Sequence, residues 1–190
     1  MKKMIALFTA LMLVACLFAG CKDEEPASGG KHHVEIDVKD YGTITLELDA
    51  DAAPITVANF LKLANEGFYN GLTFHRIMSG FMMQGGDPEG TGFGGSDETI
   101  KGEFSANGVN NPLSHTRGAI SMARNGLSMD SASSQFFICH KDSFFLDGQY
   151  AAFGKVVDGM DADDEIAEVN TDNIDRPLTE CRMKRVFIEE

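Results

Sequence analysis

The sequence lacks several features that mark common protein classes. Its four cysteines include no Cys-x-x-Cys pair, so a zinc ribbon or thioredoxin-type site has no support. The 20 glycines follow no three-residue period, which excludes a collagen-like chain. Basic residues are few, with 16 Lys and Arg against 29 Asp and Glu, and the formal net charge is −13. That charge argues against nucleic acid as a partner, because neutralising phosphates requires clustered Lys and Arg.

The composition otherwise suits a folded protein. Hydrophobic residues make up 43% of the 190 positions and include 14 Phe, which excludes disorder throughout. The length fits one domain, or at most two small ones.

The first twenty residues differ from the rest. Lys2 and Lys3 precede the uncharged residues 4–20, and charge returns at Lys22. A basic start, an apolar run and small residues at its end are typical of a secretory signal. A membrane span needs about 20 apolar residues, and this run is slightly short. We therefore predict a signal peptide over residues 1–20.

Residues 19–21, Ala-Gly-Cys, resemble a bacterial lipobox, whose cysteine becomes the lipidated first residue of the mature protein. Cys16 is a competing match, but a polar segment directly follows Cys21, which favours Cys21. Residues 21–31 then read as a flexible tether. The resemblance implies a lipoprotein held outside the cytoplasm on the bacterial cell membrane through Cys21. An acidic chain gains no attraction to anionic lipids, so the lipid would be its attachment.

Hydrophobic periodicity predicts many short strands and two helices. Alternating apolar residues over 34–38 and 44–48 predict a β-hairpin. One helix is predicted from Pro54 to Gly67, and an acidic one near 163–169. Further strands are predicted at 99–104, 118–123, 135–140, 152–157 and 183–189. The pattern favours a mainly β protein, a closed barrel with helical caps.

Other apparent motifs carry no chemistry. The glycine-rich run 90–95 lacks the Lys-Ser/Thr of a P-loop, so tight backbone turning explains it better. The acidic run 161–165 lacks the glycine and the spacing of a calcium loop. No metal site is predicted. Cys139 and Cys181 are predicted to be free buried thiols, and a disulfide is the alternative outside the cytosol.

Residues 74–87 set Arg76 and Gln84 among aromatic and methionine side chains. A core strand explains the apolar residues but not the clustering of these two polar ones. The segment resembles the signature strand of the cyclophilins, the cyclosporin-binding class of peptidyl-prolyl cis/trans isomerases. Matching blocks follow in the family's order at 118–123, 134–138 and 145–156. The resemblance implies a cyclophilin-like domain over residues 32–190.

The fold that the resemblance implies is a closed eight-stranded antiparallel β-barrel capped by two α-helices, with a substrate groove on its outer surface. Arg76 matches the catalytic arginine of the family. The pocket for the substrate proline matches Phe81, Met82, Phe137 and Leu146. The other matching groove positions are Gln84, Ala123, Arg124, Gln135, Phe145 and Tyr150.

Three groove positions depart from the familiar eukaryotic pattern. Phe145 stands where many members have Trp, Tyr150 where many have His, and Arg124 where the family often has Asn. Phe in place of Trp removes an indole N–H donor. The resemblance therefore implies weak cyclosporin binding with isomerase activity retained.

The residues suit the implied chemistry. The barrier to rotation about a peptide bond is about 18–20 kcal/mol, from amide resonance. No bond breaks, so rotation needs no nucleophile, metal or cofactor. The enzyme need only favour the twisted state, in which a guanidinium such as Arg76 can donate to the prolyl nitrogen. The implied partners are proline-containing segments of exported proteins, and a monomer suffices.

Two other functions stay open at this stage. The chain could be a binding module that holds proline-containing segments without turnover, or a lipoprotein with a structural role. Exchange kinetics separate them, because binding without acceleration favours the module and loss of both favours the structural role.

Overall fold

The computed structural model describes residues 29–189. The predicted signal peptide, Cys21 and nearly all of the predicted tether lie outside the described residues. The first strand begins at Lys31, the last residue of that tether. The strands are β1 (Lys31–Val38), β2 (Gly42–Asp49), β3 (Arg76–Met78), β4 (Met82–Gly85), β5 (Ala119–Met122), β6 (Phe136–Cys139), β7 (Ala152–Asp158) and β8 (Met183–Ile188). The helices are α1 (Pro54–Asn65) and α2 (Met160–Ala167), with 3₁₀ turns η1 (Ser105–Asn107) and η2 (Phe144–Leu146).

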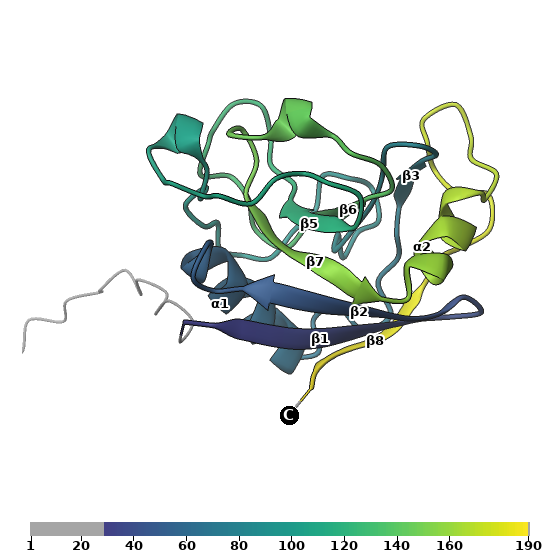
Figure 1. Ribbon diagram of the computed structural model, residues 1–190. Coiled ribbons are helices and arrows are strands. Elements are labelled where there is room, and N and C mark those ends of the chain that lie inside the picture. The colour runs from purple at the N-terminus through teal and green to yellow at the C-terminus, as the bar shows by residue number, and fades with distance from the viewer. Residues whose placement is uncertain (1–28, 190) are drawn as a thin grey trace, which may run out of the picture.

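All eight strands form one antiparallel sheet in the order β3-β4-β6-β5-β7-β2-β1-β8. Figure 1 shows the long β1–β2 hairpin running alongside β7, with α2 at one end of the sheet. The prediction of a mainly β, antiparallel fold with two helices is confirmed.

The prediction of a closed barrel is wrong, because the sheet curls but stays open between β3 and β8. Only the isolated bridge between Thr73 and Arg182, with a few neighbouring backbone hydrogen bonds, links the two edges. The loop after α2 occupies the edge of β3 instead: the Ile77 N–H donates to the Asp175 carbonyl at 2.8 Å. A ladder between β3 and β8 has no room there.

The main core lies on the inner side of the sheet and is built around Phe60 of α1. The Phe60 ring contacts Tyr69, Phe136 and Phe153 at centroid distances of 4.9, 5.4 and 5.3 Å. All four side chains are fully buried. Because aromatic side chains bury large apolar areas, this cluster holds α1 against the sheet.

The predicted strand 99–104 is not a strand. Its one pairing is the isolated bridge between Ile100 and Ala132. Glu103 instead reaches the start of α1, where its carboxylate accepts from the Ile55 N–H at 3.1 Å and the Thr56 N–H at 2.7 Å. It also accepts from the Thr56 hydroxyl at 2.7 Å. Ile100 and Phe104, the large apolar side chains of this segment, are buried without a ladder.

Both described cysteines are free and buried, as predicted. Burial raises the pKa of the Cys139 thiol to about 12, so it stays protonated at neutral pH. No helix among residues 29–189 is long and apolar enough to cross a membrane.

Candidate active site

The register of the sheet places the signature residues in one row. Arg76 on β3 pairs with Gln84 on β4, Gln84 pairs with Phe137 on β6, and Phe137 pairs with Ser121 on β5. Side chains alternate between the two faces of a strand. The intervening row is in the main core and comprises Ile77, Met83, Ile138 and Ile120. The row from Arg76 to Ser121 therefore lies on the outer face.

A second apolar cluster lies on this outer face. It centres on Met82, Phe137 and Leu146, which are nearly fully buried, and includes Ala119 and Cys139. A cavity of about 190 Å³ opens above it. Pockets for drug-sized ligands are usually about 300–1,000 Å³, so this one suits a single ring. Its lining residues are Arg76, Phe81, Met82, Gln84, Ala123, Arg124, Phe137, Leu146 and Tyr150.

The structure thus gathers nine of the eleven predicted site residues around one cavity. The other two lie beside it. Phe145 is two-thirds exposed, and its ring centroid is 5.5 Å from that of Phe81 at the cavity rim. Gln135 lines an adjoining hollow of about 520 Å³, which shares Gln84, Ala123 and Arg124 with the cavity. The roles of these residues in binding and catalysis stay predictions.

A chain of amide groups forms one side of the site. The Gln84 amide donates to the Gln135 side-chain oxygen at 2.7 Å, and the Gln135 amide donates to the Gly94 carbonyl at 2.7 Å. Hydrogen bonds at both ends fix these side chains, so the wall between the cavity and the adjoining hollow is ordered before a substrate arrives.

Arg124, which departs from the family pattern, folds back over the site wall. Its guanidinium carbon lies 4.8 Å from the Tyr150 ring centroid and 5.3 Å from that of Phe104. Its Nε donates to the Gln149 carbonyl at 3.0 Å. Guanidinium groups are attracted to aromatic faces, which places this charge against Tyr150 at the cavity edge.

Arg76 lies at the edge of the cavity formed by β3, and its guanidinium is bound by Asp175, which does not line the cavity. Its Nε donates to an Asp175 carboxylate oxygen at 3.3 Å, and Nη2 lies 3.0 Å from the Met78 sulfur. The Arg76 side chain is 42% exposed. The Arg76 guanidinium is therefore a charged donor beside an apolar floor, the combination expected for stabilising a twisted prolyl amide.

Comparison with known proteins agrees with this geometry. The profile of the family described as cyclophilin type peptidyl-prolyl cis-trans isomerase/CLD matches residues 33–188. The chain belongs to this family. Peptidyl-prolyl cis-trans isomerase B of Bacillus subtilis is 52% identical over 124 residues, which cover 65% of this chain and 82% of that protein. A peptidyl-prolyl cis-trans isomerase of Helicobacter pylori strain J99 is 52% identical over 115 residues, 60% of this chain and 67% of that protein.

A solved cyclophilin shares the fold. The crystal structure of a Cryptosporidium parvum cyclophilin type peptidyl-prolyl cis-trans isomerase, described as in the presence of the dipeptide Ala-Pro, has a TM-score of 0.77 and 32% identity. The match covers 83% of this chain and 99% of that one. The chain is thus a cyclophilin-type peptidyl-prolyl isomerase in sequence and in fold.

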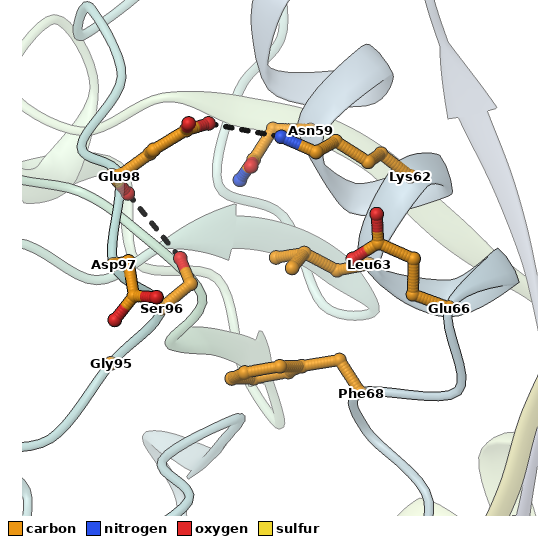
Figure 2. Close-up of a pocket in the computed structure, with 9 residues that line it drawn as sticks. All are labelled: Asn59, Lys62, Leu63, Glu66, Phe68, Gly95, Ser96, Asp97 and Glu98. Atoms are coloured by element: carbon orange, nitrogen blue, oxygen red, sulfur yellow. Dashed lines mark hydrogen bonds and ion pairs between the residues drawn. The ribbon is translucent and has the colours of Figure 1, made fainter.

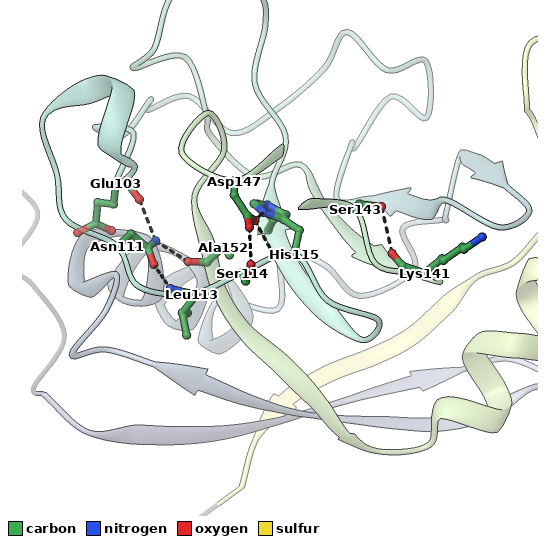
Figure 3. Close-up of polar contacts among 10 residues, drawn as sticks. Glu103, Asn111, Leu113, Ser114, His115, Lys141, Ser143, Asp147 and Ala152 are labelled. Atoms are coloured by element: carbon green, nitrogen blue, oxygen red, sulfur yellow. Dashed lines mark hydrogen bonds and ion pairs between the residues drawn. The ribbon is translucent and has the colours of Figure 1, made fainter. Parts of the chain in front are cut away.

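A buried histidine, His115, lies beneath the floor of the cyclophilin site and was not predicted from the sequence. His115 Nδ1 lies 2.7 Å from an Asp147 carboxylate oxygen (Figure 3). The other ring nitrogen, Nε2, lies 2.9 Å from the Ser121 hydroxyl. The His115 ring stacks under Phe137 with centroids 6.0 Å apart. Asp147 directly follows η2, which carries Leu146. His115 therefore links the floor of the cyclophilin pocket to the turn that forms its far wall.

Asp87 organises the glycine-rich loop beside the site. Its carboxylate accepts from the backbone N–H groups of Glu89, Thr91, Gly92 and Gly94 at 2.6–3.3 Å. Burial acts to raise the pKa of this carboxyl, but the backbone donors prevail and hold it below its usual value. The loop amides, which a P-loop would offer to phosphate, donate to this carboxylate instead.

A third hollow, of about 250 Å³, lies between α1 and residues 95–98, with Leu63 and Phe68 pointing into it (Figure 2). It shares Gly95 and Ser96 with the hollow that Gln135 lines. At its mouth Lys62 pairs with Glu98 at 2.9 Å. Sequence patterns do not predict this hollow, because Lys62 and Glu98 on its two sides are 36 residues apart along the chain.

Two buried histidines predict how stability changes with pH. Burial lowers the pKa of His75 and, despite the nearby Asp147 carboxylate, that of His115, below the ordinary 6.5. The unfolded chain then binds more protons than the folded one just below pH 6.5, so the unfolding free energy falls as the pH drops through that region. Urea unfolding at pH 7.5 and 5.5 measures the change. A free energy that is constant or rises on acidification would contradict it.

Proposed function

We propose that this isomerase is held outside the cytoplasm by a lipid on Cys21 and catalyses rotation about X-Pro bonds in exported proteins, assisting their folding. The catalytic class follows from membership of the family. The observation that carries the mechanism is the placement of Arg76 at the rim of a cavity floored by Met82, Phe137 and Leu146. The location rests on the sequence pattern of residues 1–21.

Catalysis is non-covalent in this mechanism. The proline ring enters the cavity and packs on Phe137 and Met82, which exclude water from one side of the bond. Twisting the amide makes the prolyl nitrogen a hydrogen-bond acceptor, and an Arg76 N–H donates to it. The planar substrate offers no such acceptor, so the interaction favours the transition state over both ground states. Each 1.36 kcal/mol of that difference corresponds to about tenfold in rate.

Exchange kinetics test the catalytic part. Isomerisation of a proline-containing peptide is measured with the full mature chain in detergent, by a protease-coupled assay or by NMR exchange. Acceleration at catalytic concentrations is expected. Binding of the peptide without acceleration would instead identify a binding module. The contact of Arg124 with Tyr150 is equally compatible with that function.

Mass spectrometry of the mature N-terminus tests the location. A lipid-modified Cys21 with residues 1–20 removed is expected after expression in a bacterial host. Modification of Cys16 would move the tether boundary but keep the anchor. An unmodified terminus at neither cysteine would refute the lipoprotein assignment and leave the isomerase assignment untouched.

Cyclosporin affinity tests the role of Phe145. Phe145→Trp restores an indole N–H at the exposed cavity rim, and we expect about three- to tenfold tighter cyclosporin binding, the effect of one hydrogen bond. Inhibition titrations of the two proteins measure the change. Phe144→Trp, at the neighbouring position that is also exposed, is the matched control and should leave the affinity unchanged. Equal gains in both variants would contradict the assignment.

A further inference from the structure

The loop between α2 and β8 is a built structure that closes on itself. The Asp172 N–H donates to the Arg176 carbonyl and the Leu178 N–H to the Asn170 carbonyl, both at 2.8 Å. The Asp172 carboxylate accepts from the Ile174 and Arg176 N–H groups, both at 2.9 Å. Side-chain bonds of this kind fix a turn without a regular element. The loop therefore presents its tip in a defined position.

Asp175 stands at that tip with an unusual backbone. Its φ is +64°, in the left-handed region that L-residues other than Asn and Asp seldom adopt. Only Asp40 shares a positive φ among the non-glycine residues that the structure describes. Such a conformation persists where surrounding contacts hold it, and residues of this kind cluster at functional sites.

Asp175 contacts two consecutive residues of β3. Its carbonyl accepts from the Ile77 N–H at 2.8 Å, and its carboxylate accepts from Arg76 Nε at 3.3 Å. Arg176 extends the attachment by donating from Nη2 to the Gly90 carbonyl at 3.2 Å. The loop thus docks on β3 from the side opposite the cavity floor, and Figure 1 shows it beside that strand.

We infer that Asp175 is a positioning residue for catalysis, acting through Arg76; the inference rests on the proposed role of Arg76. A guanidinium is a rigid planar fork, so a bond to Nε fixes the plane in which the terminal nitrogens lie. Asp175 uses Nε. The terminal nitrogen Nη2 lies against the Met78 sulfur, a weak acceptor that a substrate nitrogen can displace. The pair is about two-fifths exposed, so it contributes little to folding and acts mainly on orientation.

Two substitutions weaken or remove the contact without disturbing the backbone, because Asn and Gly both tolerate a positive φ. Asp175→Asn keeps an acceptor and loses the charge, and we expect kcat/KM to fall about threefold. Asp175→Gly removes the acceptor, and we expect at least about a tenfold fall, chiefly in kcat, since misplaced catalytic groups lose rate. The matched control is Asp164→Asn on α2. It weakens the exposed ion pair between Asp164 and Arg117 and should keep full activity.

A double-mutant comparison separates positioning from a structural role. If Asp175 acts through Arg76, Arg76→Ala combined with Asp175→Gly is as active as Arg76→Ala alone. If Asp175→Gly lowers activity by the same factor in the Arg76→Ala background as in the unsubstituted protein, that result would overturn the inference. So would full activity of Asp175→Gly beside an impaired Arg76→Ala, which would leave the proposed function intact. Full activity of Arg76→Ala would overturn both.

The NMR signal of the Arg76 Nε–H gives a readout that does not depend on turnover. We expect a resolved, slowly exchanging resonance in the unsubstituted protein that shifts and broadens in Asp175→Gly and is unchanged in Asp164→Asn. An Arg76 resonance unaffected by Asp175→Gly would overturn the inference even if activity fell.

Discussion

Arg76→Ala lowers kcat/KM for a proline-containing peptide by at least about tenfold, which corresponds to about 1.4 kcal/mol of transition-state stabilisation. The guanidinium is the charged donor at the rim of the apolar cavity, and alanine leaves the prolyl nitrogen without a hydrogen bond in the twisted state. The protein stays folded, because the side chain is 42% exposed and its pair with Asp175 lies near the surface. A protease-coupled or NMR exchange assay measures the loss.

Controls for Arg76→Ala separate the donor from the charge. Arg76→Lys keeps the positive charge but loses the planar fork, so it should recover little of the activity. Arg117→Ala removes an arginine of similar exposure that pairs with Asp164, away from the cavity, and should match the unsubstituted protein. Full activity of a folded Arg76→Ala protein would refute the mechanism.

Glu103→Ala lowers the unfolding free energy by at least about 3 kcal/mol, because one buried carboxylate accepts three hydrogen bonds at the start of α1. Ala53, which precedes the helix, supplies no side-chain cap of its own. Removing Glu103 leaves buried donors unpaired and removes a negative charge from a helix N-terminus. The melting temperature should fall by about 6–12 °C. Urea and thermal unfolding measure both quantities.

Two further variants test whether the Glu103 carboxylate stabilises the start of α1. Glu103→Gln keeps one acceptor oxygen and should have an intermediate effect. Glu66→Ala makes the same change at the exposed far end of α1 and should alter the free energy by less than about 0.5 kcal/mol. A Glu103→Ala protein as stable as the unsubstituted one would show that water replaces the carboxylate at no cost.

Local periodicity was enough to predict the first hairpin and both helices. The hairpin prediction matches β1 and β2, since each buried residue alternates with a partly exposed one. α1 begins at the predicted Pro54, and Gly67 lies just beyond its end with a φ of +70°. These features depend on neighbours a few residues apart, which a sequence records directly.

Long-range contacts were not predictable in the same way. Glu103 lies 47 residues from Thr56, His115 lies 32 residues from Asp147, and Asp175 lies 99 residues from Arg76. None of these pairs leaves a periodic signal, so the contacts could not be predicted from residue patterns. The groove residues came from the resemblance to cyclophilins instead, and the strand register explains why they meet.

The open sheet leaves β3 and β8 as edge strands. An exposed strand edge offers unpaired N–H and C=O groups on which another polypeptide can add as an extra strand and aggregate. Here the Ile77 N–H on β3 donates to the Asp175 carbonyl, and the Val186 N–H on β8 donates to the Asn70 side-chain oxygen at 2.9 Å. Neither donor is free to pair with another chain. With these donors occupied, a chain bound at the cavity on the outer face is less able to add to either edge as an extra strand.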